Sequence, residues 1–212
     1  MVSTGPKRWR ATSAHDETSL ERAALVCYEA DGWLGDHGEG GLILTLIKAA
    51  SIRRLPESYA SAFVEGLYYH PTAEGLPTPS EMLANIKSVT TEDIGRTYSV
   101  VAMRIGAPEY YPSVTLDKVL GLFSILGAQR LEAIAALFAQ APYDLRAGWP
   151  DLTLWRANQI VFREVKGPGD RVHASQRRLI QTILKPLGAL TSALSTSKPP
   201  RRRFSRSYFH AP

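Results

Sequence analysis

The periodicity of the sequence changes at Gly148, and this change limits the possible fold more than any other feature of the chain. Before Gly148, apolar residues recur mostly at helical spacing. After it come two short apolar segments, PDLTLW at 150–155 and IVFREVK at 160–166, and the residues between them favour a turn. The pattern predicts a mixed α/β fold in which a helical region precedes a β-hairpin.

The 212-residue chain has the composition of a globular protein, with 44% hydrophobic and 21% charged residues. These values exclude a wholly disordered chain, a collagen and a coiled coil. Cys27 is the single cysteine, which excludes a disulfide framework and a cysteine-based zinc site. No apolar run approaches the ~20 residues of a bilayer span, and the N-terminus lacks the apolar core of a secretory signal. We expect a soluble intracellular protein with no membrane partner.

The net charge of +5 is concentrated in residues 198–212, which contain five basic residues and no acidic residue. The remaining 20 basic residues equal the 20 acidic residues of the chain. A basic tail is typical of a solvated chain end, although it also suits nuclear import or loose phosphate contact. The overall charge therefore decides little about function.

Composition and periodicity divide the chain into four parts. Residues 1–17 are polar and irregular, and we expect a flexible N-terminus. Residues 18–146 form a predicted helical lobe, and residues 147–190 hold the hairpin and a helix that Pro186 ends. Residues 191–212 are rich in Ser, Pro and Arg, and we expect a basic, disordered tail.

The predicted lobe begins with a helix at Leu20, for which Thr18 or Ser19 is the N-cap. A glycine-rich loop at 32–41 leads into a buried apolar helix at 42–55. A short helix is expected at 57–67 and a long polar one at 80–103. Two apolar helices follow at 115–126 and 128–140, separated by Gly127.

Asp151, Glu164 and Lys166 stand at the open end of the predicted hairpin. Antiparallel pairing brings the start of the first strand beside the end of the second, and residues 164 and 166 share a face. Two carboxylates that repel each other suit a divalent cation, and oxygen ligands favour Mg²⁺ or Mn²⁺ over zinc. Such an ion can polarise a phosphodiester, while the lysine neutralises charge in the transition state.

This pattern also fits an ordinary solvated hairpin face, so its surroundings matter. Between residues 148 and 188, seven basic residues stand against three acidic ones, a local net charge of +4. A positive collar around an acidic cluster suits a substrate with a phosphate backbone. The surroundings therefore favour the site over the solvated face.

Four segments, which form three separated blocks, resemble one known family. GWPDLTLW (148–155) and VFREVKGPGDRVHASQ (161–176) resemble the VRR-NUC nuclease domain, a branch of the PD-(D/E)XK nucleases. GWLGDHGEGGLILTL (32–46) and LDKVLGLFSILGAQRLEAIAALFAQ (116–140) resemble segments of the Fanconi-associated nucleases. The blocks cover roughly residues 19–188. The resemblance implies a restriction-endonuclease-like PD-(D/E)XK core behind an N-terminal helical lobe.

The resemblance also implies roles for individual residues. Asp151 and Glu164 would be metal-binding carboxylates, with the main-chain carbonyl of Val165 as a further ligand. Lys166 would be the catalytic lysine, and Gln176 would help to position the site. Glu39, in HGEG, would be a metal-binding glutamate donated by the helical lobe.

Other residues near these motifs are weaker candidates. Glu39 also fits a purely structural acid at a helix N-terminus, and His37 is more typical of a structural or exposed histidine than of a metal ligand. The basic residues expected to contact DNA are Arg163, Arg171, Arg177 and Arg178.

The resemblance implies a metal-dependent DNA phosphodiesterase that uses Mg²⁺ or Mn²⁺. Its substrates would be branched DNA, notably 5′ flaps, and its role would be DNA repair in the nucleus, including interstrand crosslink repair. The expected partners are DNA and proteins of repair complexes.

The chain departs from the family pattern in three respects. It begins after the family's upstream DNA-binding and helical-repeat regions. His173 replaces a serine of the motif, and Leu179 stands where the family prefers tryptophan. The family closes its sheet with a hydrophobic strand after Gly188, whereas residues 197–212 fit no strand, so the presence of the last strand stays open.

Two other interpretations remain. The first is another PD-(D/E)XK enzyme, such as a stand-alone VRR-NUC nuclease or a resolvase. The second is a truncated, catalytically silent DNA-binding remnant. Metal-dependent cleavage of DNA would distinguish an enzyme from the remnant.

Overall fold

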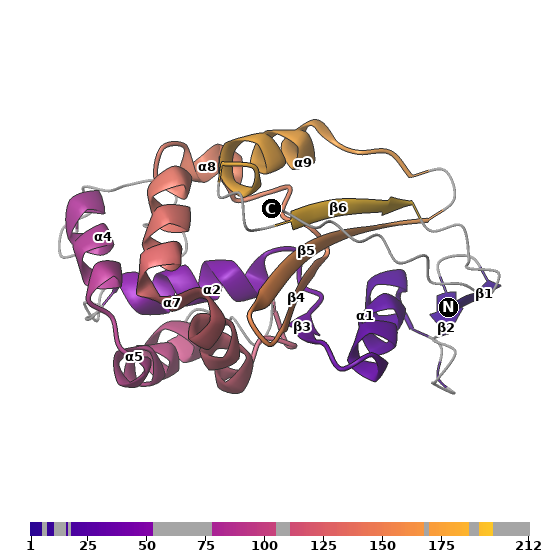
Figure 1. The fold of residues 1–212 in the computed structure, drawn as a ribbon, viewed down its shortest axis with the longest axis horizontal. Coiled ribbons are helices and arrows are strands. Elements are labelled where there is room, and N and C mark those ends of the chain that lie inside the picture. Colours follow the sequence, from indigo (N-terminus) through magenta and orange to yellow (C-terminus); the bar gives the residue numbers. More distant parts are fainter. Residues whose placement is uncertain are drawn as a thin grey trace.

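The computed structural model describes residues 1–5, 8–10, 16, 18–52, 78–104, 111–167, 170–186 and 191–196. Helices pack on both faces of a four-stranded sheet with the strand order β3-β4-β5-β6 (Figure 1). The helix expected at 57–67 lies outside the described residues.

The centre of the sheet is the predicted hairpin of β4 (Leu152–Arg156) and β5 (Gln159–Lys166). Arg156 pairs with Gln159, so the turn consists of Ala157 and Asn158. Ala157 has a φ of 51°, in the left-handed region that such two-residue turns require. The hairpin predicted from the change of periodicity at Gly148 is therefore confirmed.

Two strands flank the hairpin where none was predicted. The segment 32–41, expected to be a loop, contains β3 (Leu34–Asp36), which pairs antiparallel with β4. The expected disordered tail begins instead with β6 (Thr191–Thr196), which pairs parallel with β5. The last strand of the sheet is therefore present. A strand of three residues is too short for periodicity to reveal.

Alternation along the hairpin divides the interior into two clusters. One face of the hairpin packs into a large core through Trp155, Ile160 and Phe162. The other side of this core is formed by helices α2 (Gly41–Ser51), α4 (Pro79–Lys87), α5 (Thr91–Arg104) and α7 (Leu116–Phe138). Leu152 and Leu154 face a smaller cluster with α1 (Leu20–Ala30) on the other side of the sheet (Figure 1). The expected helical lobe and the hairpin thus share one core.

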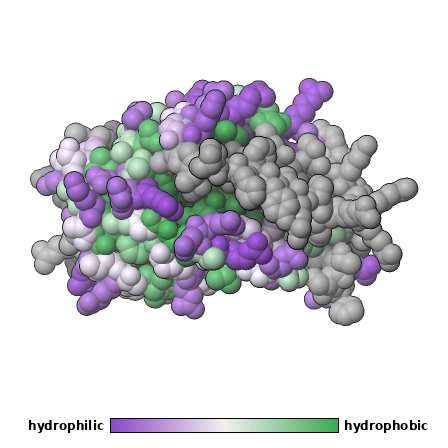
Figure 2. Space-filling model, in the orientation of Figure 1, coloured by the Kyte–Doolittle hydropathy of each residue, from purple (hydrophilic) through white to green (hydrophobic). Residues whose placement is uncertain are grey.

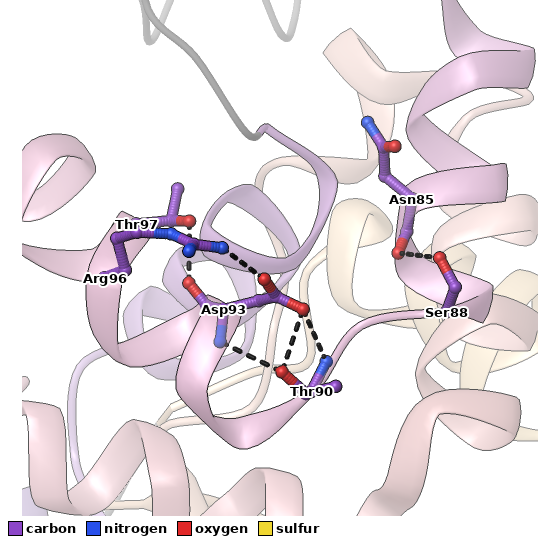
Figure 3. Close-up of polar contacts among 6 residues, drawn as sticks. All are labelled: Asn85, Ser88, Thr90, Asp93, Arg96 and Thr97. Carbon is purple, nitrogen blue, oxygen red and sulfur yellow. Dashed lines mark hydrogen bonds and ion pairs between the residues drawn. The ribbon is translucent and has the colours of Figure 1, made fainter.

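The polar helix expected at 80–103 is two helices, α4 and α5. Between them, the Thr90 N–H and hydroxyl contact Oδ2 of Asp93 at 3.1 and 2.8 Å, and the Asp93 N–H donates to the Thr90 hydroxyl (Figure 3). Arg96 also pairs with Asp93 (Figure 3). These bonds satisfy the free N–H groups at the start of α5, so a new helix begins there.

Gly127 breaks α7, as predicted. Its φ of 68° and ψ of 169° are not helical, so the helix consists of two segments. By length and composition alone α7 could cross a membrane. Eight of its residues are buried, and they pack into the core.

The N-terminus differs from the flexible segment that was expected. It contains β1 (Val2–Gly5) and β2 (Arg8–Arg10), which pair with each other. Trp9 is buried and exchanges two backbone hydrogen bonds with Thr18. Ser19 is the N-cap of α1, where its hydroxyl accepts a hydrogen bond from the Arg22 N–H. A buried aromatic side chain thus anchors a segment whose composition is polar.

Candidate active site

The strand register places Asp151 opposite Glu164. Leu152 pairs with Arg163, so the preceding residue on β4 faces the next one on β5. Both carboxylates are buried, with Asp151 9% and Glu164 4% exposed. Oδ2 of Asp151 accepts a hydrogen bond of 2.6 Å from the Val165 N–H. The predicted pair of acids is therefore brought together by the hairpin itself.

Lys166 and Gln176 hold Glu164 from two directions. The Lys166 Nζ lies 2.5 Å from Oε1 of Glu164, and the Gln176 Nε2 donates to the same oxygen at 2.5 Å. Oε1 of Gln176 accepts from Lys166 Nζ at 3.4 Å. One amide thus orients both the carboxylate and the amine. The structure brings together all four residues predicted to be catalytic, together with Val165.

Helix α9 (Ala174–Leu179) carries Gln176 to this position. Oε1 of Gln176 also accepts from the His173 N–H at 2.9 Å, so the side chain caps its own helix. The start of α9 lies against Gly148, which has a φ of 87°; a Cβ there would be 2.4 Å from the Ser175 carbonyl carbon. Only glycine permits this approach of the helix to the segment that leads into β4.

Burial raises the pKa of Asp151 to about 7. The Val165 N–H and the charge of Lys166 act in the opposite direction, while the charges of Glu164 and Glu21 raise the pKa further. Glu21, in the first turn of α1, is a neighbour that the sequence analysis missed. The only sequence feature that pointed to Glu21 was its place next to a helix N-terminus, where acids are common because the helix dipole favours them.

Glu39 lies in the turn before α2, which we call the Glu39 loop (residues 37–40). Its side chain is exposed and its φ is 39°. The loop packs against the hairpin, because a Cβ at Gly40 would lie 2.3 Å from Cγ of Trp149, two residues before Asp151. Trp149 is itself fixed by a hydrogen bond from its Nε1 to the Leu145 carbonyl at 2.9 Å, at the end of α8 (Pro142–Leu145).

The carboxylate of Glu39 does not join the other two acids. Among the described residues, no three His, Cys, Asp or Glu side chains lie close enough together to hold one metal ion. The loop therefore brings the Glu39 backbone towards the hairpin without completing the predicted set of ligands.

His37, in the same loop, is half-buried. Burial lowers its pKa, which favours the neutral imidazole. Its Nδ1 is buried and has no hydrogen-bond partner among the described residues. The neighbouring charges are those of Asp36, Arg22, Lys118 and Glu21.

The four arginines predicted to contact DNA lie in two environments. Arg163 precedes Glu164 on β5, so its side chain leaves the opposite face of the sheet, and its Nε is buried without a partner among the described residues. Arg171, Arg177 and Arg178 are exposed on and before α9. Helix α9 lies at the top of the molecule in Figure 1, and hydrophilic residues cover much of the same edge in Figure 2. The structure thus separates Arg163 from the site and leaves the other three accessible.

The residues of the hairpin suit a divalent cation. Two carboxylates are held close together in a partly dry environment, which the raised pKa of Asp151 reflects. All the available ligand atoms are oxygens, the donors that Mg²⁺ and Mn²⁺ prefer. Asp151, Glu164 and the Val165 carbonyl are therefore a chemically suitable set of ligands.

A comparison with known protein families matches part of this chain to one family of nuclease domains. Residues 102–189 match the VRR-NUC domain, and this range includes all of α7, the hairpin and α9. Residues 102–189 therefore resemble a VRR-NUC domain, whose fold is of the PD-(D/E)XK type.

Two curated relatives and a solved structure extend the likeness beyond that domain. Over 81% of this chain, the sequence is 27% identical to Fanconi-associated nuclease 1 of Danio rerio. Over 83% of this chain, it is 22% identical to the Schizosaccharomyces pombe homolog of that nuclease. A crystal structure of paFAN1 bound to 5′-flap DNA matches 93% of the chain with a TM-score of 0.59 and 20% identity. These likenesses confirm the family resemblance and the fold.

The chain is much shorter than these relatives. It spans 19% of the Danio rerio protein, 27% of the Schizosaccharomyces pombe protein and 39% of paFAN1.

Proposed function

We propose that this chain is a metal-dependent DNA nuclease that hydrolyses phosphodiester bonds. The observation that carries the proposal is the buried set of Asp151, Glu164, Lys166 and Gln176, joined by hydrogen bonds and an ion pair. Buried carboxylates that face each other are costly to a fold, and a cation offsets that cost. The match to the VRR-NUC domain supports the same conclusion.

The cation would be Mg²⁺ or Mn²⁺, held by Asp151, Glu164 and the Val165 carbonyl, with Glu39 as a ligand from the neighbouring loop. When bound, such an ion polarises a phosphodiester and lowers the pKa of a water molecule. The Val165 N–H orients Asp151 through its 2.6 Å hydrogen bond. Glu39 has to turn from its exposed position to reach this site, because its carboxylate lies apart from the other two.

Lys166 contributes a positive charge beside the reacting phosphate. Its Nζ is held between Glu164 and Gln176, so its position is set before a substrate binds. A charge that is already in place stabilises a phosphate transition state without further reorganisation. Gln176 acts as a positioning residue, through its contacts with the Glu164 carboxylate and the Lys166 amine.

The substrate that we propose is branched DNA, in particular a 5′ flap, and the role is DNA repair in the nucleus, including interstrand crosslink repair. The support is the likeness to Fanconi-associated nucleases and to paFAN1, which was crystallised with 5′-flap DNA. The exposed Arg171, Arg177 and Arg178 would contact the phosphate backbone. Proteins of repair complexes are the other proposed partners.

The test is cleavage of a labelled 5′-flap DNA by the purified chain with Mn²⁺. We expect Glu164→Gln to slow cleavage more than about 100-fold, because it removes a metal ligand as well as the partner of Lys166. Chelation of the metal should have the same effect. Glu92→Gln, an exposed acid on α5, is the matched control and should cleave normally.

Two further measurements separate the alternatives. A folded chain that binds the flap without cutting it under any metal condition would be a silent DNA-binding remnant, and the proposal would be wrong. Equal cleavage of flapped, branched and plain duplex DNA would contradict only the substrate preference.

A further inference from the structure

Asp36 forms an ion pair that the site described above does not use. It ends β3 and is 1% exposed. Its Oδ1 lies 2.8 Å from Nζ of Lys118, in the first turn of α7, 82 positions further along the chain. Burying the two charges of an ion pair costs desolvation free energy, so the role of this pair lies in the segments that it holds in place.

The two oxygens of Asp36 hold different segments. Oδ2 accepts a hydrogen bond of 3.2 Å from the Gly38 N–H, within the Glu39 loop. Oδ1 binds Lys118, whose Nζ also donates to the Ser113 carbonyl at 2.9 Å. One carboxylate therefore ties the Glu39 loop to α7 and to the segment before it.

The same segment packs against the loop through an aromatic ring. A Cβ at Gly41 would lie 2.4 Å from Cδ1 of Tyr111, and one at Gly38 would lie 3.5 Å from the same atom. Burial raises the pKa of Tyr111, and the charge of Glu39 raises it further. The backbone on both sides of Glu39 is thus fixed by contacts with residues 111–118.

We propose that the Asp36–Lys118 pair is a positioning device that holds the Glu39 loop where Glu39 can serve the metal site. The inference rests on the proposed function, since it concerns a ligand of that site. Asp36 belongs to no group of His, Cys, Asp or Glu among the described residues that could hold a metal ion, and its two oxygens bind Lys118 and the Gly38 N–H. It acts through the backbone of the loop.

The test measures Mn²⁺ binding to the full chain by electron paramagnetic resonance of free Mn²⁺, without DNA. Four proteins form a double-mutant cycle: the unaltered chain, Lys118→Met, Glu39→Gln and the double variant. We expect each single substitution to raise the Kd about 10-fold, in line with the loss of residues that orient a ligand. In the double variant the second substitution should add less than about 2-fold, because both act through one ligand.

The direction of the effect separates positioning from simple electrostatics. Removing the positive charge of Lys118 near a cation site should by itself strengthen Mn²⁺ binding. Weaker binding is therefore the opposite of a direct charge effect. Lys118→Arg keeps the charge and a donor and should restore most of the affinity, and Lys87→Met, at an exposed position of α4, should change nothing.

Lys118→Met leaves Asp36 buried without its partner, which can weaken the fold. Asp36→Asn with Lys118→Met removes both charges at similar volume, and it enters the same cycle if the single variant unfolds. An unchanged Kd in these variants would overturn the inference, as would a full 10-fold effect in the Glu39→Gln background. An unchanged Kd for Glu39→Gln itself would overturn both this inference and the assignment of Glu39, whereas the loss of cleavage in Glu164→Gln would still support the nuclease.

Discussion

The hairpin and the Glu39 loop, the two parts of the proposed metal site, are held in place by different means. On the hairpin, antiparallel register alone places Asp151 opposite Glu164, and 13 positions separate them along the chain. The Glu39 loop packs on residues far from it in sequence: Gly40 lies against Trp149 and Gly38 lies near Tyr111. Asp36, just before the loop, pairs with the equally distant Lys118. The hairpin half is therefore built by local pairing, and the loop half depends on how distant segments pack.

This difference predicts how each half responds to substitution. A change on the hairpin that keeps the register should alter chemistry and leave the fold intact. A change in the packing around the Glu39 loop should alter both, because the same contacts hold the core and the loop. The helices far from the site provide a third case, in which stability changes and the site does not.

The largest combined effect is expected at Gly40. Its φ of 85° and its approach to Trp149 leave no room for a side chain, so Gly40→Ala should lower the free energy of unfolding by about 1–3 kcal/mol. Mn²⁺ binding should weaken as well, because the loop shifts. Chemical denaturation and metal titration measure the two effects.

The control for this substitution is Gly95→Ala in the middle of α5. Beyond the backbone of its own helix, none of the described residues comes within 4 Å of a Cβ built there, so alanine should stabilise the helix by ~0.5–1 kcal/mol. An unchanged free energy of unfolding for Gly40→Ala would show that the Glu39 loop is not positioned by its close packing on Trp149.

Gln176→Ala examines the hairpin half. It removes the amide that orients Glu164 and Lys166, and it also removes the cap of α9. We expect cleavage of flap DNA to slow about 10-fold with only a small loss of stability. Gln181→Ala, an exposed residue of η2 (Ile180–Leu184), is the matched control. Equal rates for both variants would show that the lysine and the carboxylate need no such support.

Asp93→Ala tests the region remote from the site. It removes the hydrogen bonds that start α5 and the pairing with Arg96, which should cost about 1 kcal/mol of stability (Figure 3). The Kd for Mn²⁺ should not change. A weaker Kd would mean that the helical region and the site are coupled more tightly than their packing indicates.

The smallest effect concerns pH in the metal-free protein. Folding raises the pKa of Asp151 from its ordinary value to about 7, so the folded state binds this proton more tightly than the unfolded state does. The resulting stabilisation is complete below the ordinary pKa and is lost as the pH rises through 7. In the presence of a chelator, we expect a lower Tm at pH 8 than at pH 6. Asp151→Asn should reduce that difference, and an unaltered difference would assign it to other groups.

The sequence predicted the elements in which neighbouring residues carry the signal. The hairpin, the break of α7 at Gly127 and the start of α1 after Ser19 all follow from local patterns. The flanking strands were missed because β3 is too short to show alternation and β6 begins a segment rich in Ser, Pro and Arg, a composition typical of disorder. The buried Trp9 was missed because its neighbours are polar.

The residues of the hairpin half were determined by the sequence itself, since a period of two along paired strands places Asp151, Glu164 and Lys166 together. Tertiary structure alone decided the surroundings of those residues. It left the Glu39 carboxylate exposed and paired Asp36 with Lys118. The contact between Asp36 and Lys118 joins residues 82 positions apart. Packing among many side chains determines such contacts, and no local pattern encodes them.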